Sequence, residues 1–370
     1  MKDLDEIVDV AVIGAGVVGL STACAVASRH HSTCIVELEA RPGLAGSTHN
    51  SGVIHSGIYY RQKSQKAVLC VEGKERLYSF CREHEVPYER CGKLIVASET
   101  ADIGKLEELM TLGRHNGLAD LEIVDRNFVR KQEPYVEAKA AIWSPSTGIV
   151  ETESFVRALF QRAIRNGVAT LLNTRLQTGT AEKAFVVINT ERETFGARVV
   201  INAAGLFADE VSKSLGGDNI TIWPVRGNYA EFAPSARHLV RGLVYPLPDP
   251  TGHGLGVHAT RTTRGNVMLG PTACVQNSKH DYESNREPLS IFYDAAKTYI
   301  PSLTLDQLRP GSSGIRARGG PPGQKFSDFR VERDPQIPHL LHAAGIDSPG
   351  LTASLAIAEL LADLVDETLL

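Results

Sequence analysis

The sequence has no long uncharged apolar run, few cysteines and no dominant sign of charge. Without such a run we expect no membrane-spanning helix, and the acidic start predicts neither a signal peptide nor a transit peptide. The 39 lysines and arginines against 43 aspartates and glutamates leave a net charge of −4, which disfavours nucleic acid as a partner. Peripheral contact with a membrane stays open.

The six cysteines are widely spaced, with no C-x-x-C pair and no cysteine–histidine pair at the spacing of zinc ligands. We therefore expect reduced thiols, no metal and a cytoplasmic location. The 370 residues are 42% hydrophobic and 22% charged, an ordinary globular balance. That length is enough for two modest domains.

A glycine motif follows the apolar segment 8–13 and opens a predicted helix at 17–28. Each of its three glycines has a physical purpose. Gly14 permits the tight turn, Gly16 lets a pyrophosphate approach the backbone, and Gly19 lets helix and strand pack closely. The free amides at the start of the helix then hold the phosphates.

An acidic residue, Glu37, lies near the end of the next predicted strand, at 33–38. A carboxylate at this place accepts both ribose hydroxyls of an adenosine and repels a 2′-phosphate. The motif in this context predicts a nucleotide site for NAD or FAD rather than NADP.

Periodic patterns predict the elements that follow. Helices are expected at 65–83, 101–116, 151–166, from about 207, at 289–299 and ending at 365. Strands are expected at 92–97, as a pair within 168–185, at 199–205, through a β-rich region at 226–270 that includes 255–259 and 266–269, and at 340–344, with a glycine- and proline-rich loop at 314–323.

Parts of a nucleotide-binding domain thus occur at the start, middle and end of the chain, interleaved with a β-rich part. We predict an α/β fold with a Rossmann-like domain at 1–83, 147–215 and 335–370. The β-rich α+β substrate domain is predicted at 84–146 and 216–334.

Three segments are more specific than the glycine motif: HNSGVIHSGIYY at 49–60, CGKLIVA at 91–97, and YPLP at 245–248 with LGVH at 255–258. With them the whole chain resembles the D-amino-acid-oxidase-like FAD-dependent oxidoreductases. Within these it is most similar to the L-2-hydroxyglutarate dehydrogenase/oxidase group. It departs from that group at Asn228, where an acid is usual, and at 317–325 and 345–352.

The resemblance implies FAD, bound extended across a Rossmann-like domain of the DAO/glutathione-reductase-2 type. The glycine turn would line the pyrophosphate, Glu37 the ribose and Leu176 the adenine. The loop 47–53 would lie along the isoalloxazine, and the helix start at 348–352 would face its pyrimidine edge and favour the anionic reduced flavin. The cofactor-binding candidates are Gly14, Ala15, Gly16, Val17, Val18, Glu37, Leu38, Ser47, His49, Asn50, Ser51, Gly52, Val53, Leu176, Ala204, Gly205, Gly314, Arg316, Gly345, Ser348, Pro349, Gly350, Leu351 and Thr352.

The implied reaction is hydride transfer to flavin N5 from a carbon that bears a hydroxyl, while a base takes the hydroxyl proton. His55 is the first candidate base and His258 the second, each with a structural role as the alternative. Arg316 resembles the arginine that holds a substrate carboxylate in this superfamily, since its planar fork suits that group. A structural ion pair is the alternative for Arg316.

Further substrate-binding candidates are Tyr60, Lys66, Arg226 and Tyr245, for which surface charge or packing is the alternative. His49 suggests covalent attachment of the flavin, although a noncovalent contact explains it equally well.

The predicted activity is therefore oxidation of a small 2-hydroxy acid, with L-2-hydroxyglutarate converted to 2-oxoglutarate as the first choice. The electron acceptor would be a quinone, an electron-transfer protein or oxygen. The alternatives are an FAD-dependent glycerol-3-phosphate dehydrogenase, an amine or amino-acid oxidase, and a flavin-binding protein without turnover.

Overall fold

The computed structural model describes residues 6–248 and 256–370, so the expectation at Leu255 lies outside the described residues. The helices are α1 (Val17–Ser28), α2 (Gln65–Glu83), α3 (Ile103–His115), α4 (Arg126–Gln132), α5 (Thr152–Arg165), α6 (Ala208–Ser214), α7 (Leu289–Ala296) and α8 (Gly350–Leu369). The strands are β1 (Ile7–Ile13), β2 (Thr33–Val36), β3 (Val53–Ile54), β4 (Tyr88–Glu89), β5 (Lys93–Ala97), β6 (Glu122–Asp125), β7 (Ala140–Ser144), β8 (Gly148–Val150), β9 (Ala169–Leu171), β10 (Leu176–Ala181), β11 (Val186–Thr190), β12 (Thr194–Asn202), β13 (Trp223–Phe232), β14 (Leu243–Pro246), β15 (His258–Arg261), β16 (Val267–Gly270), β17 (Cys274–Val275), β18 (Leu308–Arg318), β19 (Arg330–Arg333) and β20 (Leu340–Ala344).

The first sheet is built around a parallel core with β1 at its centre. β1 pairs in parallel with β2 and β12, β9 continues beyond β2, and β20 joins β12. The antiparallel strands β10, β11 and β19 complete the sheet. Because the core is parallel, the carboxyl ends of its strands meet at one edge, where such sheets hold their ligands.

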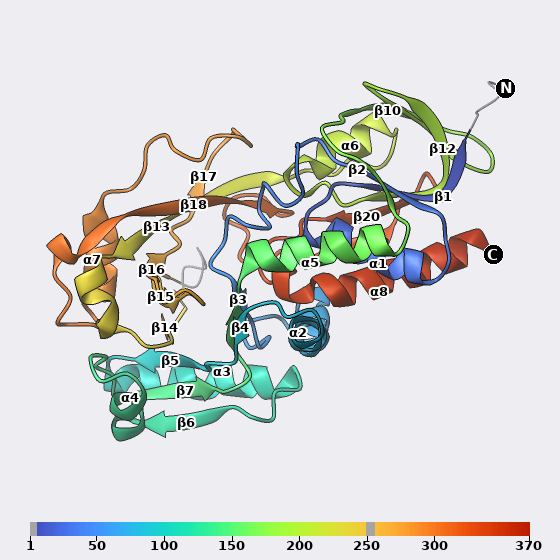
Figure 1. Cartoon of the computed structure of the whole chain (residues 1–370). Helices are drawn as coiled ribbons and strands as arrows, with labels where there is room; N and C mark the ends of the chain where they lie inside the picture. The colour runs from blue at the N-terminus through green and yellow to red at the C-terminus, as the bar shows by residue number, and fades with distance from the viewer. Residues whose placement is uncertain (1–5, 249–255) are drawn as a thin grey trace.

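Both faces of the first sheet are covered. On β1, Val10 and Val12 pack into the core formed with α1, α2, α5 and α8, whereas Ala11 and Ile13 pack on the opposite face against residues of α6 and β11. Figure 1 shows α1, α5 and α8 below this sheet and α6 above it. A parallel sheet buried on both faces reads as a continuous apolar run, as 10–13 does.

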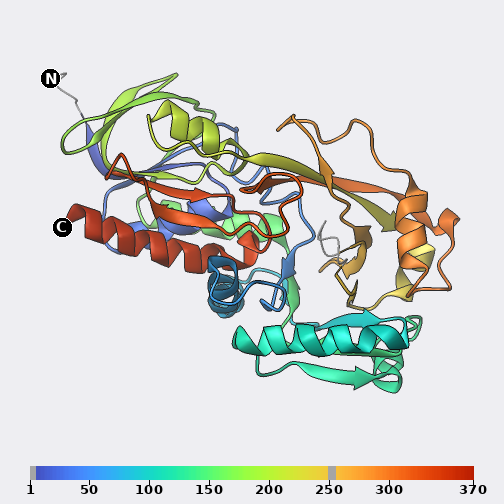
Figure 2. The same cartoon turned by 180° about the vertical axis from the view of Figure 1, so that it is seen from behind.

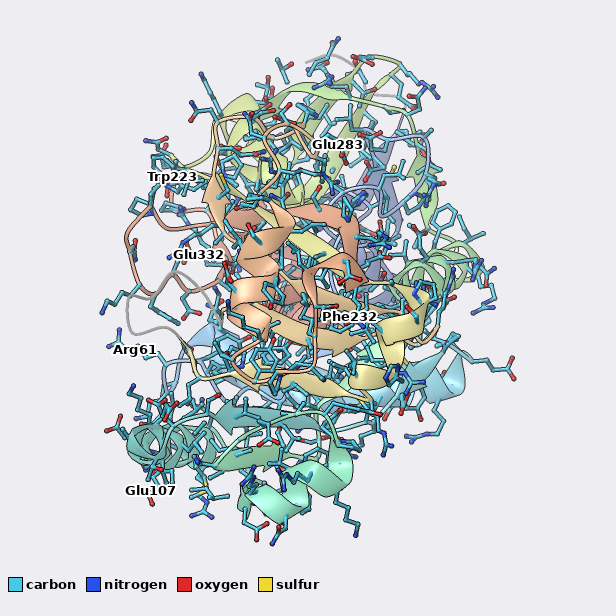
Figure 3. The ribbon with its side chains drawn as sticks, turned by 90° about the vertical axis from the view of Figure 1, so that its left-hand side faces the viewer. Arg61, Glu107, Trp223, Phe232, Glu283 and Glu332 are labelled. Atoms are coloured by element: carbon cyan, nitrogen blue, oxygen red, sulfur yellow. The ribbon has the colours of Figure 1, made fainter. Side chains whose placement is uncertain are left out.

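The second sheet takes strands from two separate stretches of the chain. Its order is β17-β13-β16-β15-β14-β5-β7-β6, and β18 pairs with β13. Helix α7 packs on β13, β16 and β18, and α3 packs on β5, β6 and β7; Figure 2 shows this half from behind. In Figure 3, viewed from the α7 side, Phe232 lies near the middle of the projection and Glu107 at its outer edge. Phe232 belongs to the core that α7 covers.

Two sequence predictions of strands need correction. The stretch 168–185 does not form a pair: β9 runs parallel to β2, and β10 pairs with β11 instead. The stretch 314–323 is not a loop from its start, because β18 continues to Arg318 through its ladder with β13. At Gly314 a Cβ would lie 2.0 Å from the carbonyl oxygen of His49, so glycine here serves a close approach of two chains.

Candidate functional site

The glycine turn after β1 is shaped by two close approaches. Gly14 has a φ of +108°, and a Cβ there would lie 2.6 Å from the carbonyl oxygen of Ala203. A Cβ on Gly19 would lie 1.9 Å from the carbonyl oxygen of Gly14. Both positions exclude larger residues, so α1 starts directly at the carboxyl ends of β1 and β12.

The start of α1 is left open toward a ligand. Gly16 is its N-cap and offers no side chain, while the Oγ of Ser47 accepts a hydrogen bond from the Val17 N–H at 2.9 Å. The other first-turn amides have no partner within the helix. Such a helix start attracts a phosphate.

The carboxylate of Glu37 stands at the end of β2, beside this turn. It accepts hydrogen bonds from the backbone N–H groups of Ala15 at 2.5 Å and Glu39 at 2.8 Å. Burial raises the pKa of the Glu37 carboxyl, against the effect of these two donors. Glu37 still lines the adjoining cavity, where its carboxylate can accept hydrogen bonds from hydroxyl groups.

One cavity of about 740 Å³ runs from this turn to the second sheet. Its lining follows the carboxyl ends of β1, β2 and β12, the loop 43–53, strands β13, β15 and β18, and the start of α8. The sequence-predicted residues in the lining are Gly14, Gly16, Val17, Val18, Glu37, Leu38, Ser47, His49, Asn50, Ser51, Val53, His55, Tyr60, Leu176, Ala204, Gly205, Tyr245, His258, Gly314, Arg316, Ser348, Pro349, Gly350 and Leu351. The candidates outside it are Ala15, Gly52, Lys66, Arg226, Gly345 and Thr352.

Two of the candidates outside the lining support the loops that form it. The Oγ1 of Thr352 accepts a hydrogen bond from the His55 N–H at 3.0 Å and donates to the Val53 carbonyl oxygen at 3.3 Å. Lys66 Nζ lies 2.5 Å from the carboxylate of Asp347, just before α8, and both side chains are largely buried. These contacts join the start of α8 to the loop after β3 and to α2.

Arg226 is buried and binds protein groups rather than facing the cavity. Its Nη1 and Nη2 donate to the backbone carbonyl oxygens of Asp281 and Asn285 at 3.3 and 3.2 Å. The guanidinium therefore fastens the 281–285 segment to β13. A role in binding substrate stays a prediction for both Arg226 and Lys66.

His258 has its tautomer set by the backbone. Its Nδ1 lies 2.9 Å from the Gly256 carbonyl oxygen, which can only accept, so Nδ1 carries the hydrogen and Nε2 is left as a proton acceptor. The imidazole stacks on Tyr245, with ring centroids 3.7 Å apart and planes inclined by 17°. Burial lowers the pKa of His258 to about 3, so the ring is uncharged at neutral pH.

His55 lines the same cavity. Its Nε2 lies 3.3 Å from the Oγ of Ser348, and its Nδ1 is buried without a hydrogen-bond partner among the described residues. Burial, together with the charge of Lys93, lowers the pKa of His55 well below its ordinary value. Both imidazoles are therefore neutral and able to accept a proton.

Arg316 enters the cavity from β18, where it pairs with Val225 of β13. Its Nη2 makes one long hydrogen bond, 3.4 Å, to the carbonyl oxygen of Thr272. In the described part of the chain no carboxylate forms an ion pair with it. A guanidinium that has only this one long hydrogen bond and no ion pair can still bind a carboxylate or phosphate with two parallel N–H···O bonds.

Sequence reasoning missed Tyr229, Thr272 and Asp347, which also line the cavity. It also passed over Lys93, which is fully buried behind Tyr245. A lysine that opens a buried apolar run, here LIVA at 94–97, was the available signal for Lys93. The other three gave no signal of their own, because their lining positions depend on how the second sheet meets the first.

A family model described as FAD dependent oxidoreductase matches residues 9–364. The chain belongs to this family. This FAD-dependent oxidoreductase is 34% identical to the mitochondrial L-2-hydroxyglutarate dehydrogenase of Nematostella vectensis, over 96% of this chain and 90% of that one. It is 31% identical to the protein of the same name in Homo sapiens, over 97% and 89%.

Among solved structures, the FAD-bound L-α-glycerophosphate oxidase of Mycoplasma pneumoniae matches with a TM-score of 0.88, 25% identity, and coverage of 98% of this chain and 95% of that one. Glycine oxidase of Geobacillus kaustophilus matches with a TM-score of 0.82 at 20% identity, which shows the fold alone. The predicted fold class, the enzymatic character and FAD as the cofactor are thereby confirmed.

The lining of this cavity, which runs from the glycine turn to the second sheet, suits an extended FAD. Gly14 and Gly16 bring no side chain to the start of α1, whose N-cap is Gly16 itself, and this suits a pyrophosphate. A Cβ on Gly205 would meet nothing within 4 Å, so the chain leaves open space there.

No helix among residues 6–248 and 256–370 is long and apolar enough to cross a membrane.

Proposed function

We propose that this FAD-dependent oxidoreductase oxidises a small 2-hydroxy acid, with L-2-hydroxyglutarate converted to 2-oxoglutarate as the first choice. The observation that carries the proposal is the combination of Arg316, which has no carboxylate partner in the described chain, with two uncharged imidazoles in one cavity. A carboxylate anchor and a proton acceptor are what a 2-hydroxy acid requires. The names and similarity of the dehydrogenase relatives support this substrate.

FAD would be held by the turn at 14–18 around its pyrophosphate and by Glu37 at its ribose. Leu176 would back the adenine, and the segments 47–53 and 348–351 would contact the flavin. When bound, FAD supplies the acceptor for the hydride of the carbon that bears the hydroxyl. Arg316, His55 and His258 then have to orient that carbon and accept the proton of its hydroxyl group.

Arg316 would bind the carboxylate next to the reacting carbon. Two parallel hydrogen bonds from its guanidinium fix the plane of that carboxylate, and the hydroxyl on the neighbouring carbon is then held in a narrow range of positions. Because the described protein offers no competing carboxylate, binding the substrate does not require an existing ion pair to break. The guanidinium of Arg316 is therefore available to form its ion pair with the substrate carboxylate.

The hydroxyl proton would pass to a histidine. We assign it first to Nε2 of His258, because the Gly256 carbonyl already takes the hydrogen of Nδ1 and leaves Nε2 free to accept. His55 is the second candidate, with Ser348 beside its Nε2. The low pKa of His258 keeps it in the accepting form over the physiological range.

Anaerobic reduction of the flavin tests the substrate. L-2-hydroxyglutarate, D-2-hydroxyglutarate and sn-glycerol 3-phosphate would be added separately to oxidised holoenzyme, and the flavin absorbance followed. We expect bleaching by the L-hydroxy acid alone. A flavin that dithionite reduces but the L-hydroxy acid does not would refute the proposal, and amino acids would be tested next.

Glycerol 3-phosphate oxidation is the second candidate function. The observation in its favour is the similarity to the L-α-glycerophosphate oxidase structure, at 25% identity and a TM-score of 0.88. The fork of Arg316 suits a phosphate as well as a carboxylate. Bleaching by sn-glycerol 3-phosphate alone would favour this candidate.

The electron acceptor stays a prediction: a quinone, an electron-transfer protein or oxygen. The cytoplasmic location also stays a prediction, and several relatives carry the word mitochondrial in their names.

A further inference from the structure

Lys93 is a buried lysine whose amine has no polar partner. Its side chain is 0% exposed, and its Nζ has no hydrogen-bond partner among the described residues. Instead Nζ lies 4.6 Å from the ring centroid of Tyr59 and 4.6 Å from that of Tyr245. Lysine is almost never fully buried without a carboxylate, so this arrangement calls for an explanation.

The position of Lys93 connects it to the substrate end of the cavity. Tyr245 lines the cavity and stacks on His258, and His55 lines it as well. The charge of Lys93 contributes to the lowered pKa of both histidines, so the ammonium acts electrostatically on this end of the cavity. Lys93 itself is not in the lining, but its amine lies over the ring of Tyr245, which is.

The groups around Lys93 cannot neutralise a positive charge. His55 and Tyr59 face it from the loop after β3, and Cys70 faces it from α2. Tyr245 of β14 and His258 of β15 are its further titratable neighbours. None of these groups is a carboxylate, and burial raises the pKa of Cys70 to about 12, so its thiol is also uncharged.

We propose that Lys93 is a specificity-determining residue: its amine takes up a proton from solvent when an anionic group of the substrate enters the end of the cavity lined by His55, Tyr245 and His258. The proton binds the lone pair of Nζ, and no bond of the substrate changes. The resulting ammonium attracts the anion through the Tyr245 ring, which is itself attractive to a cation. The inference rests on the proposed function.

Burial supports the same conclusion, because it lowers the pKa of Lys93 to about 7. At pH 8 about nine in ten of these amines are then neutral, and at pH 6 about one in ten. A nearby anion favours the charged form, so binding at pH 8 must draw in a proton. At pH 6 the amine is already charged in most molecules, so ligand binding takes up only a small fraction of a proton.

The test is a calorimetric titration of 2-oxoglutarate into oxidised holoenzyme at pH 8 and pH 6. Each titration is repeated in phosphate and in Tris, whose ionisation enthalpies differ, so that the difference gives the number of protons taken up. We expect close to one proton per ligand at pH 8 and a small fraction at pH 6. Lys93→Met should take up none and bind on the order of tenfold more weakly. Lys93→Arg should keep the affinity without proton uptake, because its charge is permanent.

Lys74→Met is the matched control, since Lys74 is also a buried lysine but its ammonium lies 3.3 Å from the carboxylate of Glu75. Lys74→Met should bind 2-oxoglutarate and take up protons as the wild type does.

Three outcomes would each overturn the inference: proton uptake that persists in Lys93→Met, binding to the wild type without proton uptake at pH 8, or no binding of 2-oxoglutarate. Flavin reduction by L-2-hydroxyglutarate is followed on the same preparations. Intact reduction without uptake defeats this inference alone, and uptake without reduction defeats the proposed function alone.

Discussion

Replacing Lys93 with methionine should stabilise the protein while it impairs ligand binding. The methionine fills nearly the same volume and removes an amine that folding must either desolvate as a cation or deprotonate. The pKa of Lys93 falls from 10.5 to about 7 in the folded chain. That difference corresponds to about 5 kcal/mol of folding free energy lost well below pH 7, and to about 4 kcal/mol at pH 7, where half of the folded amines are neutral.

The sign of the pH dependence follows from the lowered pKa. Between pH 7 and 10.5 the unfolded chain holds a proton on Lys93 that the folded chain lacks, so wild-type stability rises with pH in this range. The advantage of Lys93→Met should therefore shrink from about 4 kcal/mol at pH 7 to about 2 kcal/mol at pH 9.

Thermal unfolding of the FAD-loaded proteins measures this difference. With 370 residues and an unfolding entropy of about 2 cal/mol/K per residue, the melting temperature should rise by about 6 °C at pH 7 and about 3 °C at pH 9. Lys74→Met should give no such pH-dependent gain. A Lys93→Met protein that melts at or below the wild type at pH 7, or whose gain is the same at both pH values, would refute the reasoning.

Three further predictions concern the cavity. Arg316→Leu should lower kcat/KM for flavin reduction by L-2-hydroxyglutarate at least about a hundredfold, since two charge-assisted hydrogen bonds are lost. Arg316→Lys should recover only part of the lost kcat/KM. Equal rates of flavin reduction in Arg316→Leu and the wild type, measured by stopped flow, would contradict the role of Arg316 as the carboxylate anchor. Because burial lowers the pKa of His258 to about 3, the limiting reduction rate at saturating substrate should not fall between pH 8 and 5; a midpoint near 6.5 would exclude His258 as the base. Gly19→Ala places a Cβ 1.9 Å from the Gly14 carbonyl oxygen, so the purified protein should contain little or no flavin by absorbance, whereas a normal flavin content would show that the turn can shift.

Much of the first sheet was predictable because its determinants are local. The helix from Val17 to Ser28 and the helix from Gln65 to Glu83 were predicted at their observed bounds, and β20 was predicted at 340–344. The glycine turn needs particular residues at particular spacings, whichever protein carries it. A backbone that must approach a phosphate or another strand leaves room only for hydrogen, and that requirement is visible in a sequence.

Strand pairing was less predictable, because a strand satisfies its hydrogen bonds with whichever neighbour the fold supplies. The segment 168–185 carried two strand patterns, yet β9 and β10 have different partners. Gly314 and Arg316 follow a glycine pattern typical of a loop, yet the ladder with β13 keeps them in a strand. No local property of these residues names the partner.

The sequence by itself therefore determined the nucleotide-binding turn, the acid at Glu37, the helices at 17–28 and 65–83 and the residue types available for chemistry. Only the tertiary structure decided that Arg316, His55 and His258 line one cavity, and that Lys66 and Arg226 bind protein groups beside it. Only it placed Lys93 behind Tyr245, where burial removes the water that keeps a lysine charged. Desolvation and proximity depend on what the rest of the chain packs around a residue, which its own position in the sequence does not state.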